Sequence, residues 1–196
     1  ENGLPNNRQG GTEVYTGNGT ETYYIGGYQE GQSPGSIIGY GVVKMVRTQA
    51  EIDALGDYID IGGSYGVGVY ATEAGRQRLL KLGYTNNVQL MPGDFVYEDR
   101  NGDNKVEAQD RKVLGNLIPK WTGGFNTTLK WKNLQLYARF DMGFGFQVYE
   151  SNVAFWLGEG QGAMAFNDAI RDTWTPDNPD AKYPRVVWAS QYGTDN

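Results

Sequence analysis

The clearest pattern in the chain is a regular alternation of apolar and polar side chains in two adjacent segments. Residues 121–131 (WTGGFNTTLKW) alternate in this way, and residues 134–146 (LQLYARFDMGFGF) repeat the alternation after a two-residue turn at Lys132 and Asn133. Side chains two residues apart share one face of a strand. One face is therefore apolar and carries Trp121, Phe125, Leu129, Trp131, Leu134, Leu136, Ala138, Phe140, Met142, Phe144 and Phe146. The pattern predicts a hairpin of two strands, each of eleven residues or more.

Strand length bears on the environment of this hairpin. A strand in a soluble protein commonly has about 5–6 residues, whereas a tilted strand needs roughly 9–11 to cross a bilayer. In a soluble sandwich the apolar face would cover a core, but in a membrane barrel Phe140 and Met142 would face lipid while Arg139 and Asp141 line a wet lumen. The long strands, the short turn and the flanking polar segments favour the barrel. The predicted fold class is all-β, as part of a transmembrane antiparallel β-barrel.

Outside the hairpin, the sequence predicts turns and one or two short helices. Residues 1–47 are rich in Gly, Tyr and Thr and are typical of strand ends separated by turns. Thr48, with Glu51 three residues later, makes a capping box that opens a first helix. Thr72 is positioned to cap a second helix, which ends at Gly83 and whose leucines are expected to pack on the local structure.

Composition narrows the possible chemistry. The 196 residues include 17 Lys and Arg against 23 Asp and Glu, so a net charge of −6 provides no basic surface for nucleic acid. The chain has no Cys and no His, which excludes a structural zinc site, a Cys or Ser–His nucleophile and a haem held by His. Any metal must be a hard ion on oxygen ligands. No run of 18 apolar residues is present, so a helical membrane span is not expected.

Residues 99–110 (DRNGDNKVEAQD) place oxygen-bearing side chains at positions 1, 3, 5, 9 and 12 of a twelve-residue loop. An EF-hand-like loop uses this spacing to surround Ca²⁺ with oxygen atoms. Position 6, where such a loop turns sharply, is Asn104 rather than Gly, although Asn tolerates positive φ. We predict a structural Ca²⁺ site, with a metal-free polar turn as the alternative. Its residues are Asp99, Asn101, Asp103, Lys105 (through its backbone carbonyl), Glu107 and Asp110.

Residues 92–145 carry a series of short motifs in a fixed order: Pro92-Gly93-Asp94, Asp99 to Asp103, Asp110-Arg111, Gly115-Asn116, Pro119-Lys120 and Gly124-Phe125. In these motifs and their order, the segment resembles the C-terminal barrel region of the SusC/RagA-type TonB-dependent outer-membrane transporters of Bacteroidetes. Residues 27–40 and 173–185 also resemble external-loop segments of that family. The resemblance implies a 22-stranded barrel with an N-terminal plug, capped by a SusD-like lipoprotein and importing oligosaccharides or peptides with energy from TonB.

The resemblance also implies a division of the chain. Residues 1–196 would form a C-terminal barrel section without catalytic chemistry, located in the outer membrane. Within it, residues 91–120 would be an extracellular loop with the calcium motif, 121–147 the transmembrane hairpin in contact with lipid, and 148–190 a long extracellular loop. Prolines at positions 176, 179 and 184 agree with a loop there. TonB would engage an N-terminal part of a longer polypeptide, which this sequence lacks.

Three features depart from the family pattern. Residues 42–53 stand where an Asp-Gly pair is usual, and residues 56–90 are expected to form an enlarged loop. The final residue, Asn196, is not the aromatic residue expected at the end of an outer-membrane barrel.

A soluble, calcium-stabilised extracellular module that binds carbohydrate is the main alternative. Its sugar-stacking platforms would be Trp156, Trp174 and Trp188. In that case another sheet would cover the apolar side of the hairpin, including Phe140, Met142 and Phe144.

A glycoside hydrolase is a second alternative, because it needs only two carboxylates at a suitable separation. Candidate residues are Glu150, Glu159 and Asp168, although solvated acids of a surface loop are the simpler interpretation. We therefore expect no enzyme activity.

Overall fold

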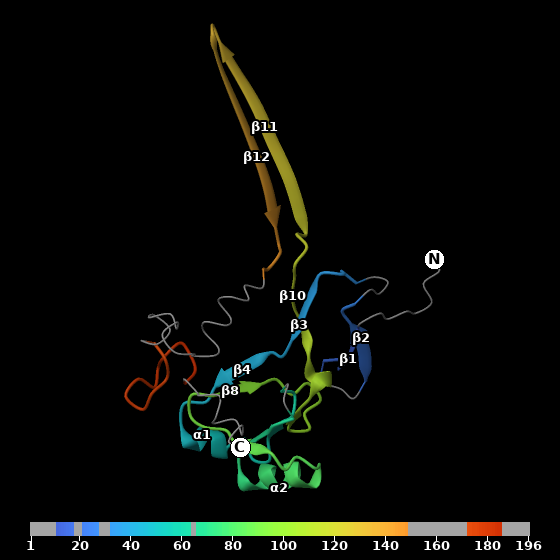
Figure 1. The fold of residues 1–196 in the computed structure, drawn as a ribbon, viewed down its shortest axis with the longest axis vertical. Coiled ribbons are helices and arrows are strands. Elements are labelled where there is room, and N and C mark those ends of the chain that lie inside the picture. Colours follow the sequence, from blue (N-terminus) through green and yellow to red (C-terminus); the bar gives the residue numbers. More distant parts are fainter. Residues whose placement is uncertain (1–10, 18–20, 28–31, 64–65, 149–171, 186–196) are drawn as a thin grey trace, which may run out of the picture.

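The computed structural model describes residues 11–17, 21–27, 32–63, 66–148 and 172–185, shown in Figure 1. Within these ranges most elements are β-strands, joined by two α-helices and one 3-10 turn, so the predicted all-β class is confirmed. No helix in the described part of the chain has the length and apolar character needed to cross a membrane.

The predicted hairpin is present and projects away from the rest of the molecule (Figure 1). Strands β11 (Trp121–Trp131) and β12 (Leu134–Phe144) each have 11 residues and pair antiparallel along their whole length. Lys132 opens the two-residue turn with a φ of 50°, as tight hairpin turns require at their first central position. The register places Phe125 opposite Phe140, so the apolar residues of both strands share one face.

Two further antiparallel pairs lie between the hairpin and the compact end of the molecule (Figure 1). Strand β3 (Ser36–Gly39) pairs with β10 (Lys112–Asn116), which leads directly into the hairpin. Strand β4 (Val42–Met45) pairs with β8 (Phe95–Tyr97). A separate N-terminal pair consists of β1 (Thr12–Tyr15) and β2 (Thr22–Ile25).

Residues 56–90 form a compact unit rather than the expected enlarged loop. A four-stranded sheet has the order β7 (Asn87–Gln89), β6 (Gly68–Tyr70), β5 (Ile59–Asp60) and β9 (Lys105–Val106). Strand β5 is antiparallel to β6 and parallel to β9, while β6 is parallel to β7. The expectation was wrong because these strands are only two or three residues long, too short to show an alternation in the sequence.

Both predicted helices are confirmed, although only half of the predicted capping box forms at α1, because the Glu51 carboxylate accepts the Arg47 N–H rather than that of Thr48. Helix α1 (Gln49–Asp53) begins at Thr48, whose hydroxyl accepts the Glu51 N–H at 3.3 Å. Helix α2 (Glu73–Lys81) begins at Thr72, but that hydroxyl donates to the Gly56 carbonyl instead of capping the helix. Gly83 follows the C-terminus of α2 with a φ of 90°, as the sequence predicted.

A hydrophobic core holds this compact unit together. It contains the buried residues Val46, Ile52, Tyr58, Ala71, Leu90, Val96 and Val106. Helix α2 covers the sheet through Leu79, which is fully buried and packs so closely on Gly68 that a Cβ there would lie 2.7 Å from a Leu79 methyl group. Leu80 and Leu82 were expected to pack as well, but they are 38% and 52% exposed. Leu80 points about 100° away from Leu79, and Leu82 is the C-cap beyond the last helical residue.

We predict that Leu79→Ala loosens α2 from the sheet. Removing a fully buried leucine costs about 2–5 kcal/mol of stability. Amide hydrogen exchange in α2, β5 and β6 of the full-length protein should therefore accelerate. Leu80→Ala in the same helix is the matched control and should leave exchange nearly unchanged, since Leu80 is partly exposed. Equal exchange in the two variants would contradict this packing.

Candidate functional site

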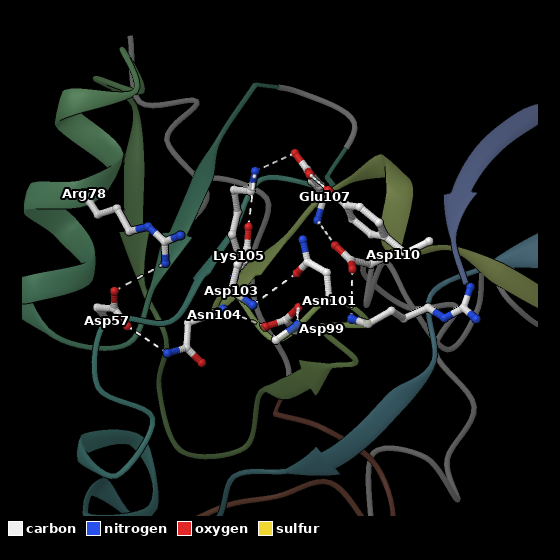
Figure 2. Close-up of polar contacts among 12 residues, drawn as sticks. Asp57, Arg78, Asp99, Asn101, Asp103, Asn104, Lys105, Glu107 and Asp110 are labelled. Atoms are coloured by element: carbon white, nitrogen blue, oxygen red, sulfur yellow. Dashed lines mark hydrogen bonds and ion pairs between the residues drawn. The ribbon is translucent and has the colours of Figure 1, made fainter. Parts of the chain in front are cut away.

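The predicted metal loop, residues 99–110, joins several parts of the compact end (Figure 2). It follows β8, contains β9 and ends in the 3-10 turn η1 (Ala108–Asp110) before β10 begins. Backbone bonds attach the loop to the sheet, because Ile59 N–H donates to the Asn104 carbonyl and Ile61 N–H to the Val106 carbonyl, each at 2.9 Å. Val106 is fully buried and anchors the loop in the core.

The first half of the loop closes on the carboxylate of Asp99. Its two oxygens accept the backbone N–H groups of Gly102 at 2.8 Å and Asn104 at 2.6 Å. Gly102 and Asn104 have φ values of 76° and 60°, so the chain turns sharply there. Asn104 thus adopts a positive φ at position 6, a conformation that Asn tolerates. The Asn104 side chain also donates to Asp57 at 3.0 Å, and Asp57 forms an ion pair with Arg78 of α2 (Figure 2).

The next two oxygen-bearing residues repeat this arrangement. Asn101 Oδ1 accepts the Asp103 N–H at 3.1 Å, and Asp103 Oδ1 accepts the Lys105 N–H at 2.8 Å. A carboxylate or amide oxygen that accepts one bond keeps a second lone pair. The side chains at positions 1, 3 and 5 therefore shape the turn and keep acceptor capacity.

Lys105 and Glu107 form an ion pair that the sequence did not reveal. The Lys105 ammonium nitrogen lies 2.9 Å from Glu107 Oε2 and 3.7 Å from Asp103 Oδ2 (Figure 2). Tyr15 of β1 donates its hydroxyl to the other Glu107 oxygen at 2.9 Å. Burial lowers the pKa of Lys105, but the hydrogen bond and charge of Glu107 outweigh burial, so the pKa is raised. The ammonium group therefore stays protonated.

Asp110 closes the loop from the inside. Its carboxylate is fully buried and accepts the backbone N–H groups of Arg100 at 2.9 Å and Glu107 at 2.8 Å. Burial raises the pKa of Asp110, while the two N–H donors act in the opposite direction. This residue ties the start of the loop to the 3-10 turn at its end.

The structure thus brings the predicted ligands into one closed loop, but their oxygens face different partners. Among the described residues, no three acidic side chains are grouped closely enough to hold a metal. The donor set consists only of oxygen atoms, which suits a hard ion such as Ca²⁺. The Ca²⁺ site stays a prediction.

The hairpin carries the largest set of exposed apolar side chains in the described chain. Trp121, Phe140 and Phe144 are 75%, 57% and 59% exposed. Phe125 and Phe140 stack across the two strands with ring centroids 6.4 Å apart. On the opposite face, Arg139 and Asp141 form an exposed ion pair at 3.0 Å.

The exposed aromatic face differs from what a soluble sandwich predicts. In the described part of the chain, no second sheet pairs with the hairpin or covers Phe140, Met142 and Phe144. The soluble-module alternative requires such a cover, which the described residues do not include.

Residues 172–185 include contacts with the turn that precedes β8. Arg185 forms a two-pronged ion pair with Asp94, at 2.5 and 3.2 Å, and its N–H donates to the Gly93 carbonyl. Trp174 packs against Gly93. The other residues singled out for the two alternatives lie outside the described ranges: Glu150, Trp156, Glu159, Asp168 and Trp188.

Comparison with known proteins gives a partial match. The chain is 34% identical over 107 residues to TonB-dependent receptor P26 of Formosa agariphila, a match that covers 52% of this chain and 10% of that protein. This chain is similar to TonB-dependent receptors. It is also 29% identical over 94 residues to receptor P3 of the same organism (48% of this chain, 9% of that protein). It is 28% identical over 143 residues to receptor P39 of the same organism, a match that covers 65% of this chain and 13% of that protein.

The chain spans about a tenth of the length of these relatives. No protein-family model matches it. The three sequence matches support the resemblance to TonB-dependent receptors in general.

We predict that Asp110→Ala opens the loop. The change leaves the part-buried N–H groups of Arg100 and Glu107 without their acceptor, and each such loss costs about 1–3 kcal/mol when the group stays away from water. Hydrogen exchange of these two amides should accelerate strongly in the full-length protein. Gln109→Ala, one residue away in the same turn, keeps both acceptor bonds and should exchange like the wild type. Slow exchange in Asp110→Ala would contradict this role.

Proposed function

We propose that this chain is a section of the β-barrel of a SusC/RagA-type TonB-dependent outer-membrane transporter, with β11 and β12 crossing the membrane. The observation that carries the proposal is the apolar face of the hairpin, which is exposed over the full length of both strands. An exposed apolar surface of this extent marks an interaction site or a membrane contact. The similarity to TonB-dependent receptors favours the membrane.

The length of the hairpin fits a bilayer. A strand of 11 residues has ten steps of about 3.3 Å and is therefore about 33 Å long. Tilted by about 40°, it covers about 25 Å, the height of the apolar band of an outer-membrane barrel. Trp121 and Trp131 lie at the two ends of β11, where barrels carry aromatic girdles.

The two faces of the hairpin match the two environments of a barrel wall. The apolar face would contact lipid, and the face with Lys130, Arg139 and Asp141 would line the wet interior. Short turns of such barrels lie on the periplasmic side, which places the turn at Lys132 there. The compact unit with the loop 99–110, and the segment 172–185, would then lie outside the cell.

The complete protein would import oligosaccharides or peptides. A SusD-like lipoprotein would cover the extracellular side, and TonB would supply energy through an N-terminal part. This activity is transport and needs no catalytic residue in the chain.

We also propose that the loop 99–110 binds Ca²⁺ as a structural ion. Support comes from its all-oxygen donor set, its sharp turn at Gly102 and Asn104, and the backbone bonds by which Asp99, Asn101 and Asp103 already direct their oxygens into the loop. Bound calcium would rigidify an external loop beside β1 and the four-stranded sheet.

The membrane proposal predicts heat modifiability of the full-length protein isolated from the outer-membrane fraction. A closed barrel resists detergent, so the unboiled sample should migrate faster in a gel than the boiled sample. Recovery in the soluble fraction, with no shift on boiling, would overturn the proposal and support the soluble calcium-stabilised module.

A pair of variants sharpens the same measurement. Phe140→Arg puts a charge on the lipid face near the middle of the hairpin, at a cost of about 2–4 kcal/mol. It should reduce the amount of heat-modifiable protein in the membrane. Tyr137→Arg introduces the same residue on the opposite face of β12 and should assemble like the wild type. Equal assembly of both variants would contradict the assignment of faces.

The calcium proposal predicts a calcium-dependent rise in the melting temperature of the full-length protein. Weak extracellular sites fill at about 0.1–1 mM calcium, so the titration should extend to several-fold higher concentrations. Asp103→Ala removes a ligand and should abolish the rise. Asp53→Ala, an exposed acid of α1 outside the loop, should keep it. If the wild type shows no rise and calorimetry shows no uptake, the loop is a metal-free turn.

A further inference from the structure

Lys105 places its ammonium group against the two carboxylate oxygens that a metal ion would need most. Asp103 uses Oδ1 for the Lys105 N–H, and Glu107 uses Oε1 for the Tyr15 hydroxyl. The remaining oxygens, Asp103 Oδ2 and Glu107 Oε2, are the two that lie 3.7 and 2.9 Å from the Lys105 nitrogen. The ammonium group thus forms a close ion pair with the free oxygen at position 9 of the loop and a longer one with the free oxygen at position 5.

Backbone geometry explains why these three residues meet. Alternate residues of an extended segment point to the same side. Val106 of β9 points into the core, where it is fully buried, so Lys105 and Glu107 point away from it. Figure 2 shows the Lys105 side chain extending between the acidic groups from this strand.

The contact of Lys105 with Asp103 and Glu107 balances charge within the loop. Asp103 and Glu107 would repel each other if nothing positive lay between them. The Lys105 and Glu107 side chains are only 21% and 23% exposed, so water screens this pair less than a surface pair. The ammonium group therefore performs at these two positions the neutralisation that a calcium ion would perform.

We infer that Lys105 is the built-in cation of the loop: it holds Asp103 and Glu107 together without metal, and Ca²⁺ binds only by displacing its ammonium group. The inference rests on the proposed calcium loop. It implies that the wild-type loop keeps its shape at low calcium and binds the ion weakly.

The test is calcium titration calorimetry of the full-length protein in detergent, together with melting temperatures in EDTA and in calcium. Lys105→Met should bind calcium at least tenfold more tightly than the wild type. It should melt lower in EDTA and regain its stability in calcium. Lys105→Gln also removes the charge but keeps a polar side chain, and it should behave in the same way. It replaces Lys105→Met in the test if that variant does not assemble.

Two controls isolate the charge of Lys105. Lys105→Arg keeps a cation beside the carboxylates and should bind calcium as weakly as the wild type. Lys112→Met removes the partner of Glu98, an ion pair just outside the loop, and should leave calcium affinity unchanged.

The outcomes separate this inference from the proposal on which it rests. Equal calcium affinity in the wild type and in Lys105→Met would overturn the role of Lys105 and leave the calcium loop standing. No uptake by any variant would overturn both. Tighter binding in Lys112→Met as well would also overturn the inference, because the effect would then be one of general charge.

Discussion

The apolar face of β11 and β12 is the constraint on which the rest of the molecule depends. Eleven pairs of residues keep the two strands in register, so every apolar side chain of the hairpin lies on the same side. Water is a poor environment for such a surface, and the described chain provides nothing to cover it. Lipid would cover this apolar face. The unpaired backbone N–H and C=O groups at the edges of the hairpin need neighbouring strands, which a barrel provides.

The compact end differs from the hairpin because its apolar side chains are buried in a core. There the short strands have no long apolar face, and stability comes from a small core to which α1 contributes Ile52. The loop 99–110 connects this core to β10, and hence to the hairpin. A hairpin with an exposed apolar face and a compact unit with a buried core thus share one continuous chain, connected through β10.

The acidic loop stays closed because each carboxylate has a defined partner. Asp99 and Asp110 accept backbone N–H groups, while Glu107 is held by Tyr15 and Lys105. Backbone N–H donors fix the shape of the loop. The Lys105 ammonium group neutralises the charge of Asp103 and Glu107, but an ion pair imposes a less strict geometry than metal coordination does. These contacts close the loop through residues of the chain itself.

The sequence by itself determined the hairpin, its faces and its turn, because a period of two over eleven residues depends only on local backbone geometry. It also indicated both helices, from Thr48, Thr72 and Gly83, and the positions of the loop oxygens. Only the tertiary structure decided that residues 56–90 form a sheet, because strands so short are stabilised by long-range pairing. It alone brought the ammonium of Lys105 and the hydroxyl of Tyr15 to Glu107, since contacts of that kind depend on how distant segments pack.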